Sequence, residues 1–432
     1  MRTRAVTVAL LMLSLPAQAQ EFFTLKGHGG PIMDIAVAPS GTIATASFDY
    51  SVGTWNGAEP SWHEGHRAAA NAVAWLDEQH LLSAGDDFAA ILWDLVTGTS
   101  QRFEGHQGKI TDIAIAPGGE TFATASWDGT IGLWPTAGGE GTFLRGHQQG
   151  VNAIAFGDGG RLLYSASSDG TIRLWDVATG QELRQIVQHG FGVNRLILDE
   201  DGDRIAYGAV DGVTRIVDPE GKEIADYTLE RRPILAMAYH APSSLLAVGD
   251  GEGYIMVIDL NAKRIVRDFR ATARGPIWAL AFSPDGQNIH AGGLDDVMYS
   301  WPVDTLDSVE QMAAGTRSFL RDPETMDNGE RQFMRKCSIC HTLTEDSARR
   351  AGPTLRGVFG RRAGSVPGYS YSATLRNSDI VWSPESINAL FDEGPDHYIP
   401  GSKMPMQRIA EAVDRRDLID YLRKATQSGD TE

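Results

Sequence analysis

The chain has 432 residues, 42% of them hydrophobic, which is long enough for at least two folded domains. Its formal net charge is −18 at pH 7, and the surplus acid lies before Thr316, because residues 316–432 carry 17 basic and 17 acidic side chains. An electrostatic field of that sign repels phosphate backbones, so nucleic acid is a poor partner, and cationic proteins or divalent ions are better candidates. The alternative is that the acidic surface only keeps the protein soluble.

The first 19 residues have the pattern of an export signal. Arg2 and Arg4 precede an apolar run over residues 5–15, and the Ala-Gln-Ala that follows predicts cleavage after residue 19. This run, and every later one, is shorter than the roughly 20 apolar residues that a membrane span needs. We therefore expect a periplasmic protein with no transmembrane segment after cleavage; an uncleaved anchor is the alternative.

A repeat of about 41 residues follows the signal. One position of each unit holds a tryptophan or a branched aliphatic residue: Trp55, Trp93, Trp134, Trp175, Val217, Ile258 and Trp301. Six residues earlier each unit has an acid: Asp49, Asp87, Asp128, Asp169, Asp211, Glu252 and Asp295. Gly-His pairs open the first four units, at His28, His66, His106 and His147, and His189 is a degenerate fifth. Alternating runs between glycine turns predict short strands.

The sequence Ser-Asp-Gly-Thr-Ile-Arg-Leu-Trp-Asp at 168–176 resembles the WD repeat, and the resemblance extends over roughly residues 21–303. It implies an all-β propeller of seven four-stranded blades over residues 20–303, in which the Gly-His histidine and the turn aspartate share a buried hydrogen-bond network with the tryptophan. Because an open ring would leave unpaired edges, residues 21–25 are expected to complete the last blade beside Trp301. The remaining histidines are scattered, so no metal site is predicted.

Residues 337–341 read Cys-Ser-Ile-Cys-His and contain both cysteines of the protein. Two thiols three positions apart can add to the two vinyl groups of one haem, and the next histidine can bind its iron; this is the haem c attachment signature. A chance motif and a dithiol that works in redox exchange are the alternatives. Since haem would use both cysteines, we expect no disulfide even in an oxidising compartment.

The repeat stops after residue 303. Residues 304–326 are polar and are interpreted as a linker, residues 327–427 resemble a class I cytochrome c of the mitochondrial type, and residues 428–432 form a tail. The resemblance implies an all-α domain with one covalent haem c and with Met404, on the loop 398–404, as the iron ligand opposite His341. Met406 is a rival on spacing alone. Two filled axial positions leave no vacancy for substrate, which indicates an electron carrier rather than an enzyme.

The same resemblance assigns supporting roles around the haem. The carbonyl of Pro353 is expected to accept the proton of His341 and so to fix the imidazole. Donors to the haem propionates are expected at Arg361, Tyr371, Trp382 and Ser402. Gly329 and Phe333 are placed on an N-terminal helix that crosses a C-terminal helix bearing Leu418 and Tyr421, and the glycine allows a close approach.

The domain also departs from the family. Phe391 stands where a tyrosine is common, Leu375 replaces an interior asparagine, and Pro-Asp-His at 395–397 replaces a lysine-rich patch at the haem edge. A smaller basic rim remains at Arg335, Lys336, Arg349 and Lys403. The haem potential and the acidic partner that are usual in the family therefore cannot be assumed for this domain. The acidic propeller of the same chain is itself a candidate to cover this basic rim.

The leading hypothesis is a periplasmic electron-transfer protein that carries one His/Met-ligated haem c. Its propeller would be a docking platform for an unidentified redox protein or membrane complex. The alternative is a redox enzyme whose propeller holds a second cofactor or substrate. A third hypothesis is a sensor or assembly scaffold whose partner binding follows the redox state of the iron; fold alone does not choose among them.

Overall fold

The structure is a computed structural model that describes residues 21–199, 203–231, 233–272, 275–304, 325–344, 350–369, 371–400, 402–404 and 407–427. The predicted signal (1–19), nearly all of the predicted linker (304–326) and the predicted tail (428–432) lie outside these residues, as do Arg349 and Met406.

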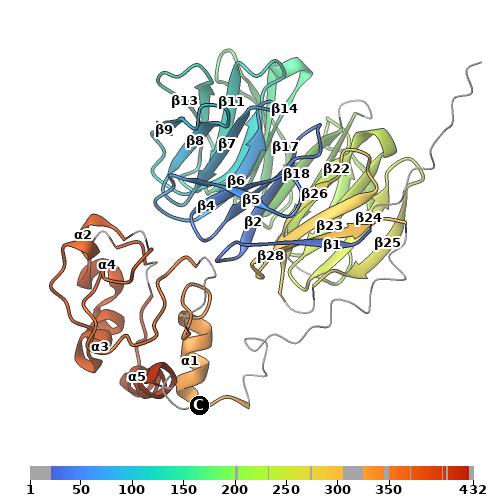
Figure 1. Ribbon diagram of the computed structural model, residues 1–432. Helices are drawn as coiled ribbons and strands as arrows, with labels where there is room; N and C mark the ends of the chain where they lie inside the picture. The colour runs from blue at the N-terminus through green and yellow to red at the C-terminus, as the bar shows by residue number, and fades with distance from the viewer. Residues whose placement is uncertain are drawn as a thin grey trace, which may run out of the picture.

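The first part of the chain forms seven four-stranded antiparallel sheets, the blades of a β-propeller (Figure 1). Blade one contains β2 (Ile32–Val37), β3 (Ile43–Ser47), β4 (Ser51–Trp55) and β5 (Pro60–Glu64). Blade two contains β6 (Ala70–Trp75), β7 (His80–Gly85), β8 (Ala89–Asp94) and β9 (Ser100–Glu104). Blade three contains β10 (Ile110–Ile115), β11 (Thr121–Ser126), β12 (Thr130–Pro135) and β13 (Thr142–Arg145). Blade four contains β14 (Val151–Gly157), β15 (Leu162–Ser167), β16 (Thr171–Asp176) and β17 (Glu182–Gln188). Blade five contains β18 (Val193–Asp199), β19 (Arg204–Ala209), β20 (Thr214–Val217) and β21 (Glu223–Asp226). Blade six contains β22 (Ile234–His240), β23 (Leu245–Asp250), β24 (Tyr254–Asp259) and β25 (Arg264–Arg270). A single 3₁₀ turn connects the first and second strands of blade four, at Asp158–Gly160, and of blade six, at Ala241–Ser243.

The seventh blade closes the ring. It combines β26 (Ile277–Phe282), β27 (Asn288–Gly293) and β28 (Val297–Pro302) with β1 (Phe23–Lys26) from the start of the chain. β1 pairs antiparallel with β28, with Phe23 opposite Ser300. This confirms the predicted closure: the pairing covers the edge of β28 that an open ring would expose.

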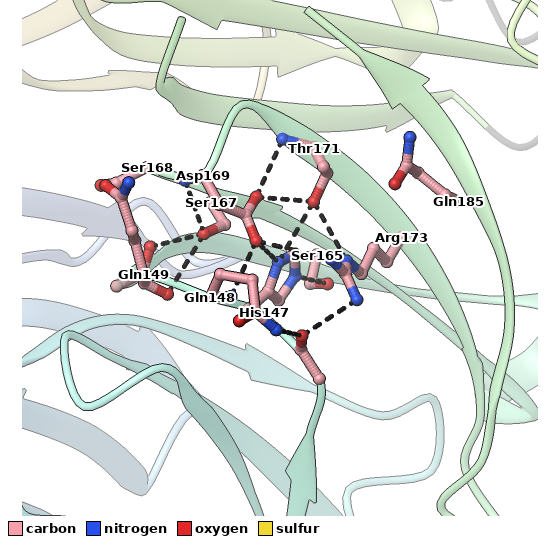
Figure 2. Close-up of polar contacts among 12 residues, drawn as sticks. His147, Gln148, Gln149, Ser165, Ser167, Ser168, Asp169, Thr171, Arg173 and Gln185 are labelled. Carbon is pink, nitrogen blue, oxygen red and sulfur yellow. Dashed lines mark hydrogen bonds and ion pairs between the residues drawn. The ribbon is translucent and has the colours of Figure 1, made fainter. Parts of the chain in front are cut away.

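The recurring residues of the repeat form a buried network between strands, shown for the fourth blade in Figure 2. His147 bonds the Asp169 carboxylate through Nδ1 at 2.9 Å and the Ser165 hydroxyl through Nε2 at 2.7 Å. The Trp175 indole donates to the same hydroxyl at 2.8 Å. Burial acts to raise the pKa of Asp169, but hydrogen bonds from Thr171 and its neighbours hold it well below the ordinary value.

The first three blades repeat this arrangement around His28, His66 and His106. The predicted structural role of these histidines and aspartates is therefore confirmed. The sixth blade uses a different acid: Asp250, two residues before Glu252, pairs with the Arg231 guanidinium at 2.9 Å and accepts the backbone N–H groups of Glu252 and Tyr254. In this blade the Asp250–Arg231 pair at the end of β23 thus takes the place of the His–Asp pair.

The C-terminal part is a small helical domain, coloured orange to red in Figure 1. Its helices are α1 (Asn328–Lys336), α2 (Ala373–Arg376), α3 (Pro384–Glu393), α4 (Pro395–Tyr398) and α5 (Ala412–Gln427). Side-chain caps start two of them: Ser372 accepts from the third N–H of α2, and Ser383 forms a reciprocal capping box with Ser386 on α3. In the described part of the chain, each helix is too short or too polar to cross a membrane.

α1 and α5 cross closely, as predicted from Gly329. A Cβ atom at Gly329 would lie 2.1 Å from the carbonyl oxygen of Asp417, so only glycine allows this separation. Phe333 on α1 packs on Tyr421 of α5 with ring centroids 5.7 Å apart, and Leu418 is fully buried. This crossing forms one wall of the domain's core.

Candidate haem site

The helical domain contains a cavity with an empty volume of about 1180 Å³, part of it open to solvent. Apolar side chains form most of its wall, among them Leu355, Val358, Ile387, Leu390 and Ile399. The cavity brings together all nine residues predicted for the haem site: Cys337, Cys340, His341, Pro353, Arg361, Tyr371, Trp382, Ser402 and Met404.

The two cysteines follow the end of α1 in a single helix-like turn. The N–H groups of Cys340 and His341 both donate to the carbonyl of Cys337, at 3.1 and 2.9 Å, and both thiols line the cavity. Burial raises the pKa of Cys337 to about 12 and that of Cys340 to about 11. A dithiol that works in redox exchange needs a lowered thiol pKa, so this environment does not favour the dithiol alternative.

The His341 imidazole is fixed by its neighbours. Its Nδ1 donates to the Pro353 carbonyl at 2.7 Å, so a neutral ring keeps the lone pair of Nε2 for a metal ion. Burial lowers the pKa of His341, which favours that neutral form although the Pro353 bond opposes the shift. A Cβ atom at Gly352 would lie 2.4 Å from the imidazole Cε1, so glycine is required beside the ring.

The loop with the second ligand candidate is held by its own turn. The N–H of Ser402 donates to the Ile399 carbonyl at 3.0 Å, and the Ser402 hydroxyl accepts the N–H of Met404 at 3.3 Å. This turn places the Met404 thioether in the wall of the same cavity as His341. In this structure Ser402 supports the loop, and its role toward a propionate stays a prediction.

Two polar side chains, Arg361 and Tyr371, also line the cavity. The Arg361 guanidinium donates to the carbonyls of Arg356 and Thr354, both at 2.6 Å, and the Tyr371 hydroxyl accepts the N–H of Val366 at 3.3 Å. Burial lowers the pKa of Arg361. The two residues could thus offer a cation and a hydroxyl to the acidic groups of a cofactor bound in the cavity.

Two of the three predicted departures, Phe391 and Leu375, lie on the cavity, whereas residues 395–397 do not line it. Phe391 is 5% exposed and Leu375 is partly buried, and both side chains line the wall. They place carbon where a tyrosine and an asparagine are common in the family. Because a phenylalanine and a leucine carry no side-chain polar atom, the two substitutions make the wall more apolar.

These residues fit an iron porphyrin. The cavity offers two thiols that would attach the haem, an imidazole and a thioether that would bind its iron, and an arginine and a tyrosine that would face its propionates, within largely apolar walls. When bound, such a haem would supply one-electron chemistry. The protein itself fixes the tautomer of His341 and shapes the loop of Met404.

Sequence reasoning missed a residue of this site that comes from the propeller. The side chain of Tyr50, from the first propeller blade, lines the haem cavity, and its hydroxyl donates to the Lys403 carbonyl at 2.7 Å. The sequence offered one signal, an aromatic residue at a turn position where the third to sixth repeats have glycine. Nothing in the repeat pattern indicated which surface that turn would meet.

The fold and the cavity together define a β-propeller fused to a haem-binding helical domain. A family model described as WD domain, G-beta repeat, matches residues 19–56, 98–135, 139–176 and 263–301. A second model, described as Cytochrome c, matches residues 326–426. The C-terminal domain of the chain belongs to the cytochrome c family, and WD repeats build the propeller.

Curated relatives support this assignment over the C-terminal domain alone. Cytochrome c of Sesamum indicum is 42% identical over 106 residues, which cover 24% of this chain and 93% of that protein. Cytochromes c of Gossypium barbadense and Gibberella zeae are 42% and 40% identical over 100 and 98 residues, which cover 87% and 92% of their lengths. Such a domain implies haem c and electron transfer, and a WD-repeat propeller suggests a docking platform.

Proposed function

We propose that the protein is an electron carrier whose all-α, class I cytochrome c domain holds one covalent haem c between His341 and Met404. The observation that carries the proposal is the single cavity that both axial candidates and both thiols line. A histidine and a thioether together stabilise reduced iron and fill both axial positions, so the domain exchanges electrons without binding substrate.

The visible spectrum of the purified full-length protein, oxidised and reduced and then with carbon monoxide, tests this proposal. We expect one low-spin haem c that is inert to carbon monoxide. Met404→Ala should bind carbon monoxide, whereas the matched variant Met406→Ala should stay inert. A parent protein that binds carbon monoxide, or that shows a second chromophore, would favour the alternative of a redox enzyme.

We further propose that the propeller is the docking platform for a redox partner, an unidentified protein or membrane complex with a cationic surface. The excess acid of residues 20–315 supports this, because opposite charge speeds encounter and orients the partner. Trp127 and Phe191, 55% and 60% exposed on loops between strands, offer aromatic contacts. Electron transfer to a cationic small-molecule oxidant should be faster than to an anionic one of equal potential, and the difference should vanish at high salt. Equal rates at low salt would contradict the role of charge.

The proposed location is the periplasm. Its support is the basic and apolar pattern of residues 1–19 together with a haem attachment motif, since covalent haem attachment of this kind follows export in bacteria. Fractionation of bacteria that express the full chain should recover haem-containing protein in the periplasm. A variant without residues 2–19 should stay in the cytoplasm without covalent haem, and covalent haem in that variant would contradict the proposal.

A further inference from the structure

An aromatic residue occupies a glycine position in the first blade. The turn between the second and third strands of a blade has glycine directly after its acid in blades three to six, at Gly129, Gly170, Gly212 and Gly253, all with positive φ. Tyr50 stands there in blade one with φ +72°, and Phe88 stands there in blade two with φ +63°. A bulky residue in this left-handed region is strained, and such strain concentrates at functional positions.

Tyr50 directs its side chain to the cytochrome c domain. Its hydroxyl donates to the carbonyl of Lys403 at 2.7 Å, a contact between residues 353 positions apart in the chain. That carbonyl belongs to the peptide unit that contains the N–H of Met404. The phenol also lines the haem cavity, so a propeller residue forms part of its wall. Burial raises the pKa of Tyr50 above its ordinary value, so the hydroxyl stays protonated and remains a donor.

The Lys403 side chain faces the same blade. Its Nζ lies 5.7 Å from the centroid of the Tyr50 ring, within the range of a cation–π contact. The first blade therefore contacts both the backbone and the side chain of Lys403, which directly precedes the proposed ligand Met404.

A second contact comes from the seventh blade, next to the first in the closed ring. Asp296 directly follows the turn acid Asp295, so it holds the position in its turn that Tyr50 holds in blade one. Its carboxylate pairs with the guanidinium of Arg350, close to the Gly352–Pro353 segment behind His341, at 3.7 Å. Two adjacent turns of the propeller thus contact the chain near both proposed axial ligands.

We propose that Tyr50 is a positioning residue for the haem site, through which the propeller holds the Met404 loop and closes the cavity to external ligands. The inference rests on the proposed function, because it takes Met404 as the iron ligand. Its consequence is that the propeller controls how readily Met404 leaves the iron and how easily small molecules reach it. The cytochrome c domain alone lacks this part of its wall.

Binding of imidazole to the oxidised, full-length haem protein measures this control, since imidazole can bind only when Met404 leaves the iron. Tyr50→Phe removes the hydrogen bond and should speed binding about fivefold. Tyr50→Gly removes the ring as well and should speed binding about tenfold or more. Hydrogen exchange of the amides at 402–404 should rise in both variants. Phe88→Gly, which relieves the same turn strain in the second blade, is the matched control and should leave both readouts unchanged.

The glycine variant separates a positioning role from a purely structural one. Because glycine is the residue of the other turns, Tyr50→Gly should not lower the unfolding midpoint of the propeller. Imidazole rates equal to the parent's in both Tyr50 variants, or raised equally by Phe88→Gly, would overturn the inference while leaving the proposed function intact. A parent protein that already binds carbon monoxide would overturn the proposed function, and the inference with it.

Discussion

Replacement of Gly329 by alanine tests the close crossing of α1 and α5. The new Cβ would lie 2.1 Å from the Asp417 carbonyl oxygen and 2.8 Å from the Tyr421 Cβ. Ordinary contacts between heavy atoms begin near 3.5 Å, so the helices must separate by roughly 1 Å at this point. The atom in the way belongs to the backbone, and a change of rotamer cannot relieve the clash.

Two energies of opposite sign decide the result. Alanine is favoured over glycine inside a helix by about 1 kcal/mol. Overpacking costs about 1–3 kcal/mol, and the upper end applies here because the crossing also packs Phe333 against Tyr421 and buries Leu418. We expect Gly329→Ala to lower the unfolding free energy of the cytochrome c domain by about 2 kcal/mol.

Urea unfolding of the full-length protein, followed by the haem absorbance, measures this loss. Asp420→Ala is the control, because Asp420 is exposed on α5 and its replacement should change the unfolding free energy by less than about 0.5 kcal/mol. A Gly329→Ala protein as stable as the parent, or more stable, would show that helix propensity outweighs the contact and would refute the reasoning.

Three further predictions concern the networks of both domains. His147→Ala leaves the buried Asp169 carboxylate without its histidine and should destabilise the propeller by about 2–3 kcal/mol in thermal unfolding. The control His80→Ala breaks a more exposed His–Asp pair and should cost less than about 1 kcal/mol. Equal losses in the two variants would contradict the role of burial. Folded-state pKa values below the ordinary 3.8 at the turn aspartates stabilise the fold above pH 3.8 and lose that contribution as the pH falls, so the propeller's unfolding midpoint should drop below about pH 4. A midpoint that rose as the pH fell below about 4 would refute the assignment. Gly352→Ala places a Cβ within 2.8 Å of three imidazole atoms of His341 and should make carbon monoxide binding to the reduced protein detectable; an inert variant would show that the ring can move aside.

Local patterns account for much of the predicted fold. The period of the repeat follows from blades that each bury one tryptophan or aliphatic side chain at the same register, so the blades and the His–Asp–Trp network were predictable from the sequence. Ring closure by β1 was predictable because the free edge of β28 in a closed propeller can pair only with a strand from the start of the chain. The sixth blade was less predictable, since Asp250 and Arg231 satisfy its turn without a Gly-His pair.

The haem site was predictable to the extent that it is a local motif or a family resemblance. Cys337, Cys340 and His341 are adjacent in sequence, and all nine predicted residues line one cavity. The family resemblance also predicted the carbonyl of Pro353 that fixes the tautomer of His341. The raised thiol pKa values were not visible in the sequence, because they come from burial in the folded domain.

Periodicity, spacing and short motifs are encoded by neighbouring residues, and they were enough to predict seven repeats, a cytochrome c domain and the haem ligands proposed for it. The effect of the two domains on each other could be found only in the folded protein. The Tyr50–Lys403 hydrogen bond joins residues 353 positions apart, and the Asp296–Arg350 pair links the seventh blade to the segment near His341. Such contacts depend on the shape of two folded surfaces, and no local pattern records which turn of a repeat will meet a haem.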